Sequence, residues 1–212
     1  MLTIAHRGAS AYKPENTLEA FKTAMSTGSR FMETDVQLTK DGRLVLCHNY
    51  EVDGRNIKTN ILKDLNLPTL EELLDILKPE TKLNIEVKND DNIYPDIERK
   101  ILAVLNIYGH KLKDNILISS FDYPTLQRVR ALDKQIKIGV LTRNFKIENV
   151  LALNAYSANM SLKRINEEIV KACHKENIKV FVYTVNTAKE AAQMAALGVD
   201  GIFSDYPDML GN

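Results

Sequence analysis

Residues 30–38 read RFMETDVQL, an apolar run that is interrupted by Glu33 and Asp35. The length of the run and its bulky apolar residues predict a β-strand. Side chains two positions apart lie on the same face of a strand, so both carboxylates point the same way. Acidic side chains that share one face near the end of a strand indicate the rim of a parallel β-barrel, where such strands open toward a site.

Strands and helices alternate on both sides of this stretch. Strands are predicted at 2–5, 83–88, 116–119, 136–141, 158–161, 179–185 and 201–204. Helices are predicted at 16–27, 69–77, 95–108, 123–132, 147–153, 164–176 and 187–197. This alternation is typical of βα units around a parallel sheet, and eight strands with seven helices between them fit an α/β fold of the (β/α)8 TIM-barrel type. An open, doubly wound sheet is the competing architecture.

The chain of 212 residues suits a single barrel domain over residues 1–212. An extended segment at 44–48 follows the turn at Asp41-Gly42. Residues 49–68 are polar and poorly patterned, and we expect them to form a small insertion after the second strand region, lying over the site.

Composition gives no support for several classes of partner. Lys and Arg number 28, as do Asp and Glu, so the balance of charge does not favour nucleic acid or an anionic membrane. No stretch approaches 18 apolar residues, which predicts no stable membrane association. Two isolated cysteines and an amino terminus without a signal-peptide pattern predict a cytoplasmic protein. The sequence does not decide the oligomeric state, and a homodimer is compatible with it.

Three carboxylates are predicted to meet at one rim. Glu33 and Asp35 share a face of one strand, and Glu86 lies near the end of the predicted strand at 83–88. Carboxylates held together repel one another and lose hydration unless a positive charge lies between them. A divalent cation with oxygen ligands, Ca²⁺ or Mg²⁺, meets that need. The alternative is a salt-bridge network with Arg7 or Lys88.

Two histidines also follow predicted strands. His6 comes directly after the strand at 2–5, and His48 ends the extended segment at 44–48. Histidine titrates near neutral pH, so such a pair can divide general acid and general base work. Arg7 and Lys88 are candidates for binding phosphate oxygens. Of the remaining histidines, His110 and His174, neither is expected to act in the site.

These residues lie in motifs that resemble the glycerophosphodiester phosphodiesterases. The resemblance begins with Ala5-His6-Arg7-Gly8 and with Pro14-Glu15-Asn16-Thr17. Four further segments match in order along nearly the whole chain: Glu33-Thr34-Asp35-Val36, Leu83–Lys88, Val182–Asn186 and Asp200–Pro207. The set is specific as a whole, although no single motif is.

The resemblance implies a TIM barrel with a small insertion that hydrolyses glycerophosphodiesters to glycerol 3-phosphate and an alcohol. It implies that a metal is bound by Glu33, Asp35 and Glu86, and that His6 and His48 are the acid–base pair. Further matches are with residues near the phosphate, namely Arg7, Lys88 and Glu15, of which Glu15 is expected to hold Arg7. Asn16 is expected to cap the first helix.

The chain departs from the family pattern at three places. The usual His-Asp pair is His48-Asn49, which removes one carboxylate near the expected metal. The motif after it is replaced by residues 52–56, and the late Val-Trp-Thr is Val182-Tyr183-Thr184. These changes bear most on the choice of alcohol. Two alternative functions stay open: a lysophospholipase-D-like activity on lysolipids, and a non-catalytic barrel that binds phosphodiesters.

Overall fold

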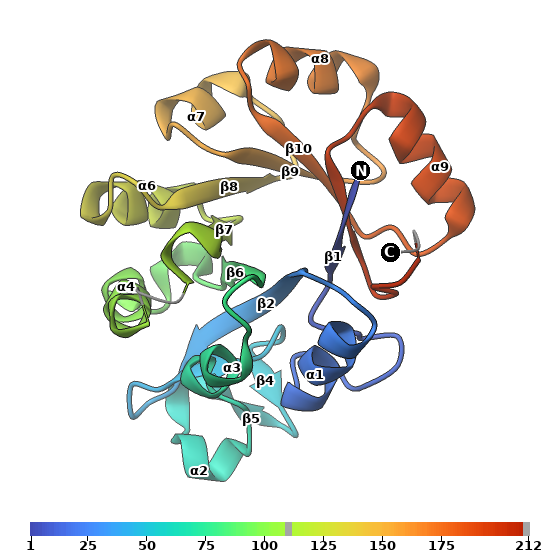
Figure 1. Ribbon diagram of the computed structural model, residues 1–212. Helices are drawn as coiled ribbons and strands as arrows, with labels where there is room; N and C mark the ends of the chain where they lie inside the picture. Colours follow the sequence, from blue (N-terminus) through green and yellow to red (C-terminus); the bar gives the residue numbers. More distant parts are fainter. Residues whose placement is uncertain (109–111, 210–212) are drawn as a thin grey trace.

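Eight parallel strands pair side by side and close into a ring in the computed structural model of the chain, which describes residues 1–108 and 112–209 (Figure 1). The strands are β1 Leu2–Ala5, β2 Phe31–Leu38, β6 Lys82–Val87, β7 Ile116–Ser120, β8 Lys137–Thr142, β9 Ser157–Ser161, β10 Lys179–Tyr183 and β11 Gly201–Ser204. The last strand pairs with the first over four residues, and β1 also pairs with β2 through Ala5 and Met32. Closure excludes the open sheet, and the predicted TIM barrel is confirmed.

Helices surround this ring on the outside (Figure 1). They are α1 Leu18–Ser26, α3 Leu70–Ile76, α4 Ile97–Ile107, α6 Tyr123–Leu132, α7 Ile147–Ala152, α8 Glu167–Lys175 and α9 Ala188–Leu197. Each was expected from the sequence, but most begin later than the apolar pattern suggests. Side-chain caps account for most of these later starts: the predicted helix at 164–176 begins at Glu167 because the Asn166 side chain accepts from the Ile169 amide.

One predicted cap is wrong. Thr17, rather than Asn16, is the N-cap of α1, and its side chain accepts from the Ala20 amide at 3.2 Å. Asn16 precedes the helix in a left-handed conformation with φ 57°, and its side chain is turned toward β2. Asparagine tolerates this backbone region better than most residues, which frees its amide for a different task in the site.

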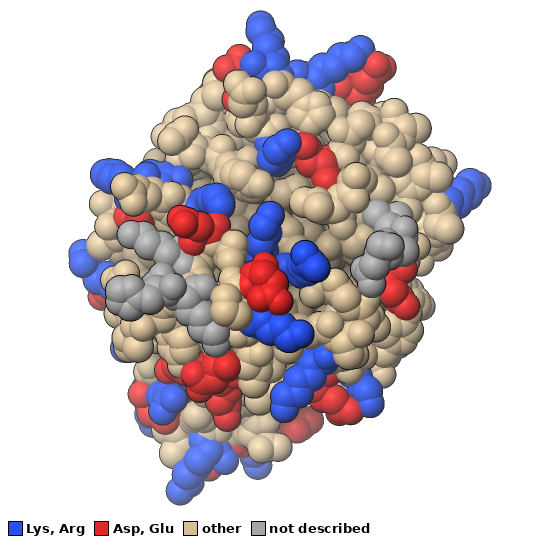
Figure 2. Space-filling view, viewed as in Figure 1, with Lys and Arg blue, Asp and Glu red and all other residues tan. Residues whose placement is uncertain are grey.

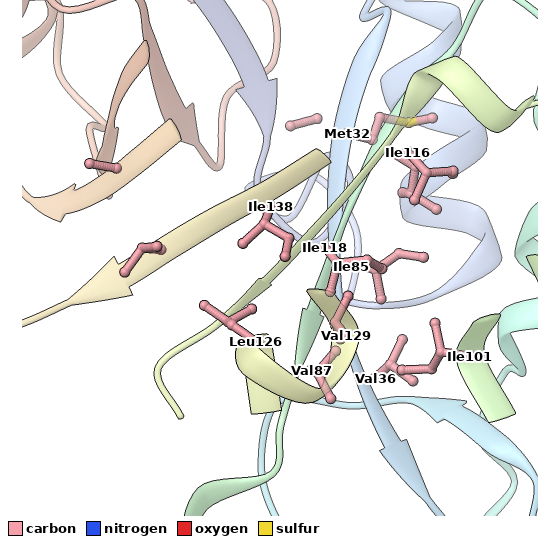
Figure 3. Close-up of a cluster of buried hydrophobic side chains, with 14 of the residues drawn as sticks. Met32, Val36, Ile85, Val87, Ile101, Ile116, Ile118, Leu126, Val129 and Ile138 are labelled. Atoms are coloured by element: carbon pink, nitrogen blue, oxygen red, sulfur yellow. The ribbon is translucent and has the colours of Figure 1, made fainter. Parts of the chain in front are cut away.

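Two apolar layers hold the barrel together. Outside the ring, β-strand residues such as Ile85 and Ile118 pack against Ile101 of α4 and Val129 of α6 (Figure 3). A separate cluster is formed by Ile4, Phe31, Leu117, Phe181 and Phe203. Ile4, Phe31 and Phe203 each lie two positions before a polar residue of the site, namely His6, Glu33 and Asp205. Residues two positions apart share a face of a strand, so this apolar layer lies inside the barrel below the carboxylates.

Strand β3 Leu44–Leu46 leaves the ring and pairs with β2 in the antiparallel direction. Residues 49–68 follow it and form a small hairpin of β4 Glu51–Val52 and β5 Arg55–Asn56, a short 3-10 turn and α2 Leu62–Leu65. They pack on β3 through Ile57, Leu65 and Val45. This segment therefore lies beside the barrel, and none of its residues lines the cavity described below.

The surface carries both signs of charge. Figure 2 shows Lys and Arg side chains interspersed with Asp and Glu side chains over one face of the molecule. Within residues 1–108 and 112–209, no helix is both long enough and apolar enough to cross a membrane.

Candidate active site

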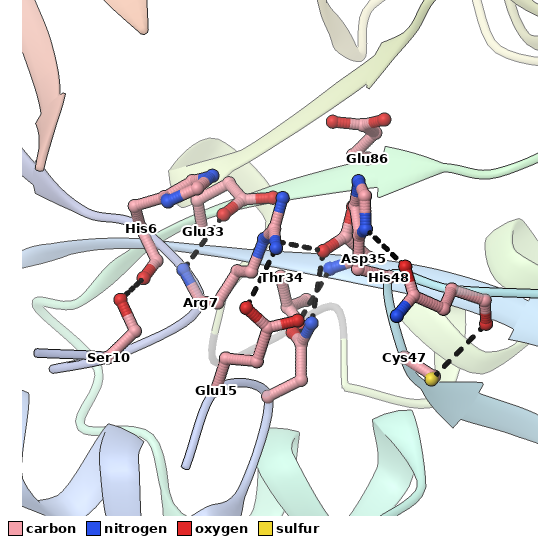
Figure 4. Close-up of polar contacts among 12 residues, drawn as sticks. His6, Arg7, Ser10, Glu15, Glu33, Thr34, Asp35, Cys47, His48 and Glu86 are labelled. Atoms are coloured by element: carbon pink, nitrogen blue, oxygen red, sulfur yellow. Dashed lines mark hydrogen bonds and ion pairs between the residues drawn. The ribbon is translucent and has the colours of Figure 1, made fainter. Parts of the chain in front are cut away.

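The carboxylates of Glu33, Asp35 and Glu86 meet at the carboxyl ends of β2 and β6. Asp35 and Glu86 are direct partners in the register of the two strands. One oxygen atom from each of the three carboxylates lies within 4.8 Å of the other two. Glu33 and Asp35 are fully buried, and the Glu86 side chain is 13% exposed. The predicted cluster is therefore assembled by adjacent strands of the barrel (Figure 4).

This cluster carries more negative charge than its surroundings neutralise. Burial, together with the neighbouring carboxylates of Asp35 and Glu86, raises the pKa of Glu33 well above its ordinary value. Burial and Asp35 raise the pKa of Glu86 to about 7. Both shifts have the same physical cause, because several carboxylates share a space with little water.

The donor set fits a divalent cation. Oδ1 of Asp35 is buried and has no hydrogen-bond partner. A buried carboxylate oxygen without a donor is costly unless a cation takes the place of the donor. Three carboxylates offer the hard oxygen ligands that Ca²⁺ and Mg²⁺ prefer. The arrangement supports the prediction of a metal site, without distinguishing between these two ions.

Arg7 joins the amino-terminal loop to this cluster. Its backbone amide donates to Glu33 at 2.9 Å, and its Nη1 donates to Glu15 at 2.8 Å. Its Nε lies 3.1 Å from Oδ2 of Asp35, an ion pair that is not aligned as a hydrogen bond. Burial opposes its charge, but Asp35 and Glu33 outweigh that effect and raise the pKa of Arg7. Glu15 therefore holds Arg7, as expected, and does not itself line the cavity.

Asn16 binds the Asp35 carboxylate and the hydroxyl of the neighbouring Thr34. Its Nδ2 donates to Oδ2 of Asp35 at 3.0 Å, and its Oδ1 accepts from the Thr34 hydroxyl at 2.8 Å. The left-handed backbone of Asn16 makes both bonds available at once. The loop between β1 and α1 thereby orients a carboxylate on β2, which sequence spacing alone did not reveal.

Gly8 is required by packing against α1 rather than by a ligand. Its φ is +80°, and a Cβ at this position would lie 2.8 Å from the backbone carbon of Ala20. Only glycine accepts both this conformation and this contact. Gly8 therefore allows the backbone of this loop to approach the first helix closely.

Lys88 lies beside Glu86 on the same face of the chain. Its Nζ is 3.1 Å from Oε1 of Glu86. Burial opposes the lysine charge, but Glu86 and Asp35 have the greater effect and raise the pKa of Lys88. A charged ammonium thus remains at the edge of the acidic cluster, where it can also meet a phosphate oxygen.

His6 is held by a carboxylate at the end of the neighbouring strand. Its Nδ1 lies 2.7 Å from Oδ1 of Asp205, which directly follows β11. Burial works in the opposite direction, but bonds from His6, Asn186 and Ser10 lower the pKa of Asp205 to about 2. Asp205 is therefore ionised at neutral pH, and it leaves Nε2 of His6 as the nitrogen available to a substrate.

His48 has a different partner. Its Nδ1 lies 3.0 Å from Oδ1 of Asn49, a neutral amide. The adjacent Cys47 packs into the cluster of Val45, Ile57 and Leu65, and its thiol donates to the Asn49 carbonyl at 3.3 Å. Burial raises the pKa of Cys47. Cys47 is therefore a packed residue, and its raised pKa does not favour a nucleophilic thiolate.

A cavity of about 210 Å³ joins these side chains to an aromatic wall. Arg7, Glu33, Glu86, Lys88 and both histidines line one part of it, and Phe121, Leu141, Arg143, Tyr183 and Phe203 are among the residues lining the rest. Phe121 and Tyr183 meet edge to face with ring centroids 5.9 Å apart. The guanidinium of Arg143 lies over Phe121 at 4.9 Å. Charged side chains and an aromatic wall thus line the same cavity.

Of the two histidines set aside earlier, His174 pairs with Asp200 at 2.9 Å and does not line this cavity. His110 lies outside the described residues. Asp205 was missed as a partner of His6, although a signal was present: it follows the last strand directly, and in a closed barrel the last strand neighbours the first.

The fold and the cavity define the class of protein: a (β/α)8 barrel enzyme with an acidic cluster and two histidines where its strands end. The family described as the glycerophosphoryl diester phosphodiesterase family matches residues 6–58 and 49–209. The chain belongs to this family. The resemblance seen in the sequence is confirmed, and so is the prediction of a phosphodiesterase.

Relatives cover nearly the whole chain. A glycerophosphodiester phosphodiesterase of Caldanaerobacter subterraneus subsp. tengcongensis is 35% identical, over 100% of this chain and 96% of that protein. One of Bacillus altitudinis is 32% identical, over 96% of this chain and 94% of that protein.

Solved structures share the fold. A phosphodiesterase of Oleispira antarctica, in complex with the product sn-glycerol-3-phosphate, has a TM-score of 0.91. It is 26% identical and covers 98% of this chain and 94% of its own. A glycerophosphodiester phosphodiesterase of Thermotoga maritima has a TM-score of 0.81 at 28% identity, covering 99% of this chain and 96% of its own.

Proposed function

We propose that this chain hydrolyses glycerophosphodiesters to glycerol 3-phosphate and an alcohol, with His6 and His48 as the acid–base pair. The observation that carries the proposal is a single cavity lined by two histidines, two basic side chains and the carboxylates of Glu33 and Glu86, with Asp35 completing the acidic cluster. Relatives with this activity in their names match over the full chain, and one solved relative holds glycerol 3-phosphate.

Glu33, Asp35 and Glu86 are the residues that would hold a divalent cation. When bound, such a cation offsets the negative charge of the phosphate and the charge that develops in the transition state. Lys88 and Arg7 add positive charge at the same edge. Asn16 and Glu15 keep Asp35 and Arg7 in place before substrate arrives.

The two histidines move protons. One removes a proton from the nucleophile, which is water or the substrate's own glycerol hydroxyl, and the other donates a proton to the leaving alkoxide. Attack by the glycerol hydroxyl forms a cyclic phosphate, which water then opens to glycerol 3-phosphate. Asp205 keeps the His6 ring in a single orientation by accepting from Nδ1. The amide oxygen of Asn49 accepts from Nδ1 of His48 in the same way. Both rings therefore present Nε2 to the cavity.

The aromatic wall is the place for the alcohol. Phosphate and glycerol lie toward the basic and acidic side chains, so the remaining part of the substrate extends along Phe121 and Tyr183. Arg143 is the charged residue on this wall. The lysolipid alternative would require the same wall to accept an acyl chain.

One assay tests the proposal against both alternatives. The protein is incubated with glycerophosphocholine, glycerophosphoethanolamine and a lysolipid, each with a divalent ion or with a chelator. We expect release of glycerol 3-phosphate from the first two, and its loss with chelator. Release of the head-group alcohol from the lysolipid, without turnover of the other two substrates, would favour the lysophospholipase-D-like activity. No turnover with any ion would favour a non-catalytic barrel.

Four finer points stay predictions from the sequence: Ca²⁺ or Mg²⁺ as the ion, a cytoplasmic location, no nucleic-acid partner, and a homodimer as a compatible assembly. Thermal denaturation with each ion separately tests the first of them, since the ion that the site prefers raises the melting temperature at the lowest concentration.

A further inference from the structure

His48 lies in a segment without regular secondary structure. Strand β3 ends at Leu46, and the next strand begins at Glu51. A catalytic side chain must be held closely, because a displacement of about 1 Å can cost about a hundredfold in rate. The contacts that hold this segment in place therefore bear on the function of His48.

One buried amide binds the chain on both sides of His48. Nε2 of Gln37 donates to the Cys47 carbonyl at 2.8 Å and to the Asn49 carbonyl at 2.7 Å. The Gln37 side chain is fully buried near the end of β2. The residues before and after His48 are thus fixed by the two hydrogens of one nitrogen atom.

The orientation of the Gln37 amide is itself fixed. Its Oε1 accepts from the hydroxyl of Tyr94 at 2.8 Å, and Tyr94 is only 3% exposed. Burial raises the pKa of Tyr94, so its hydroxyl stays protonated and able to donate. A flipped amide would place its oxygen against two carbonyl oxygens, which is repulsive.

The support extends to the strand that carries the acidic cluster. Gln37 lies two residues beyond Asp35 and four beyond Glu33, so all three side chains share one face of β2. The backbone amide of Cys47 also donates to the Asp35 carbonyl at 3.1 Å. Strand β2 therefore sets both the carboxylates and the backbone of His48.

We propose that Gln37, oriented by Tyr94, is a positioning residue that places His48 for catalysis. The proposal rests on the function proposed above, because it assigns Gln37 an effect through His48. No other common side chain combines two donors on one atom with an acceptor at this length. Glutamate cannot replace it, since its carboxylate would face two carbonyl oxygens.

The test combines kinetics with a spectroscopic measurement. Gln37→Met keeps the approximate volume and removes the amide, while Tyr94→Phe removes one hydroxyl and keeps the ring. We expect Gln37→Met to lower kcat about tenfold or more with little change in KM. Tyr94→Phe should lower kcat by a smaller factor, and it keeps the test decisive if Gln37→Met does not fold.

A matched control and a double variant separate positioning from stability. Asn115 donates to the Pro79 carbonyl at 2.7 Å, before β7 and away from the cavity. Asn115→Ala should change stability without changing kcat. In a His48→Ala background, Gln37→Met and Tyr94→Phe should lower kcat no further, because their effect passes through His48. An equal loss in both backgrounds would overturn the proposal, as would unchanged kcat in both single variants.

The spectroscopic measurement distinguishes this proposal from the proposed function. NMR of protein labelled with ¹⁵N-histidine reports the His48 ring whether or not the protein turns over substrate. We expect the His48 signals to shift and broaden in Gln37→Met, while the His6 signals stay in place. Unchanged His48 signals would overturn the positioning role. If the wild-type protein does not turn over substrate but Gln37→Met still shifts the His48 signals, only the proposed function is contradicted.

Discussion

Nδ1 of His48 lies 3.0 Å from the amide oxygen of Asn49, whereas Nδ1 of His6 lies 2.7 Å from a carboxylate of Asp205. The two rings are oriented in the same way but by groups of different charge. A carboxylate stabilises a protonated imidazole, and a neutral amide does so much less. The position at which this chain departs from its family pattern therefore distinguishes its two histidines.

Replacement of Asn49 with aspartate should show which proton His48 moves. The added carboxylate favours protonated His48, so one limb of the pH–rate profile should move to higher pH by about one unit. A shift of the acidic limb would identify His48 as the base, and a shift of the alkaline limb would identify it as the acid. Asn49→Ala is the control and should lower kcat without that shift. If neither limb moves in Asn49→Asp, the contact does not act on the reaction.

Replacement of Asp205 with asparagine should lower kcat and leave the fold intact. The amide keeps the shape of the side chain but loses the charge that supports the His6 ring. The loss should be part of the about 10²- to 10⁴-fold that general acid–base catalysis contributes. Ser10→Ala, which removes one weaker contact to Asp205, is the milder comparison. Steady-state kinetics checks both, and an unchanged kcat in Asp205→Asn would remove Asp205 from the mechanism.

Stability should depend on pH and on the divalent cation together. The pKa of Glu86 is raised from 4.5 to about 7 by burial and Asp35, and that of Glu33 is raised in the same direction. Without a cation the folded protein binds more protons than the unfolded chain, so these groups stabilise it below pH 4.5. That contribution is lost as pH rises through about 7.

A cation must displace these protons, so it should stabilise the protein more at pH 8 than at pH 5. At a hundredfold excess over Kd we expect a rise in melting temperature of about 5–10 °C at pH 8. Glu86→Gln should reduce both the rise and its dependence on pH. Equal stabilisation at the two pH values would contradict the assignment of these carboxylates as ligands.

Much of the fold and of the candidate site could be predicted because each depends on local pattern. Strand β2 shows its acids at i and i+2, and His6 follows a short apolar strand directly. Such signals need no knowledge of which strands are neighbours. The closure of β11 on β1 cannot be seen in any local pattern. The contact of His6 with Asp205, which are 199 positions apart, depends on this closure.

The supporting residues could not be predicted for the same reason. Gln37 reads as an ordinary polar residue at a strand end until the return of β3 brings the Cys47 and Asn49 carbonyls to it. Asn16 was expected at a helix cap because its type suits that position, but Thr17 suits it equally and lies nearer the first turn. Competition between two good caps is decided by what else each side chain can bind.

Gly8 and Gly54 form a matched pair for testing why the amino-terminal motif contains glycine. Both have positive φ, at 80° and 72°, but a Cβ meets Ala20 only at Gly8 and meets nothing within 4 Å at Gly54. Gly54→Ala should cost about 1–2 kcal/mol in the free energy of unfolding. Gly8→Ala should cost more, because α1 must also move. Urea unfolding measures both, and equal losses would show that the contact with α1 is unimportant.

Arg143 should determine which alcohols leave fastest. Its guanidinium lies over the face of Phe121 at 4.9 Å, so that face is already occupied by a cation. A quaternary ammonium cannot stack there, whereas a head group with a carboxylate or several hydroxyls can accept hydrogen bonds from the guanidinium. We therefore expect kcat/KM to be higher for glycerophosphoserine than for glycerophosphocholine.

Substitution of Arg143 tests this order of substrates directly. Arg143→Gln removes the charge and uncovers the ring of Phe121, so the ratio of the two kcat/KM values should shift toward glycerophosphocholine by about tenfold. Arg55→Gln is the control, because Arg55 lies in the hairpin beside the barrel and does not line the cavity. It should leave the ratio unchanged. A wild-type preference for glycerophosphocholine that Arg143→Gln does not alter would show that the alcohol leaves without meeting this wall.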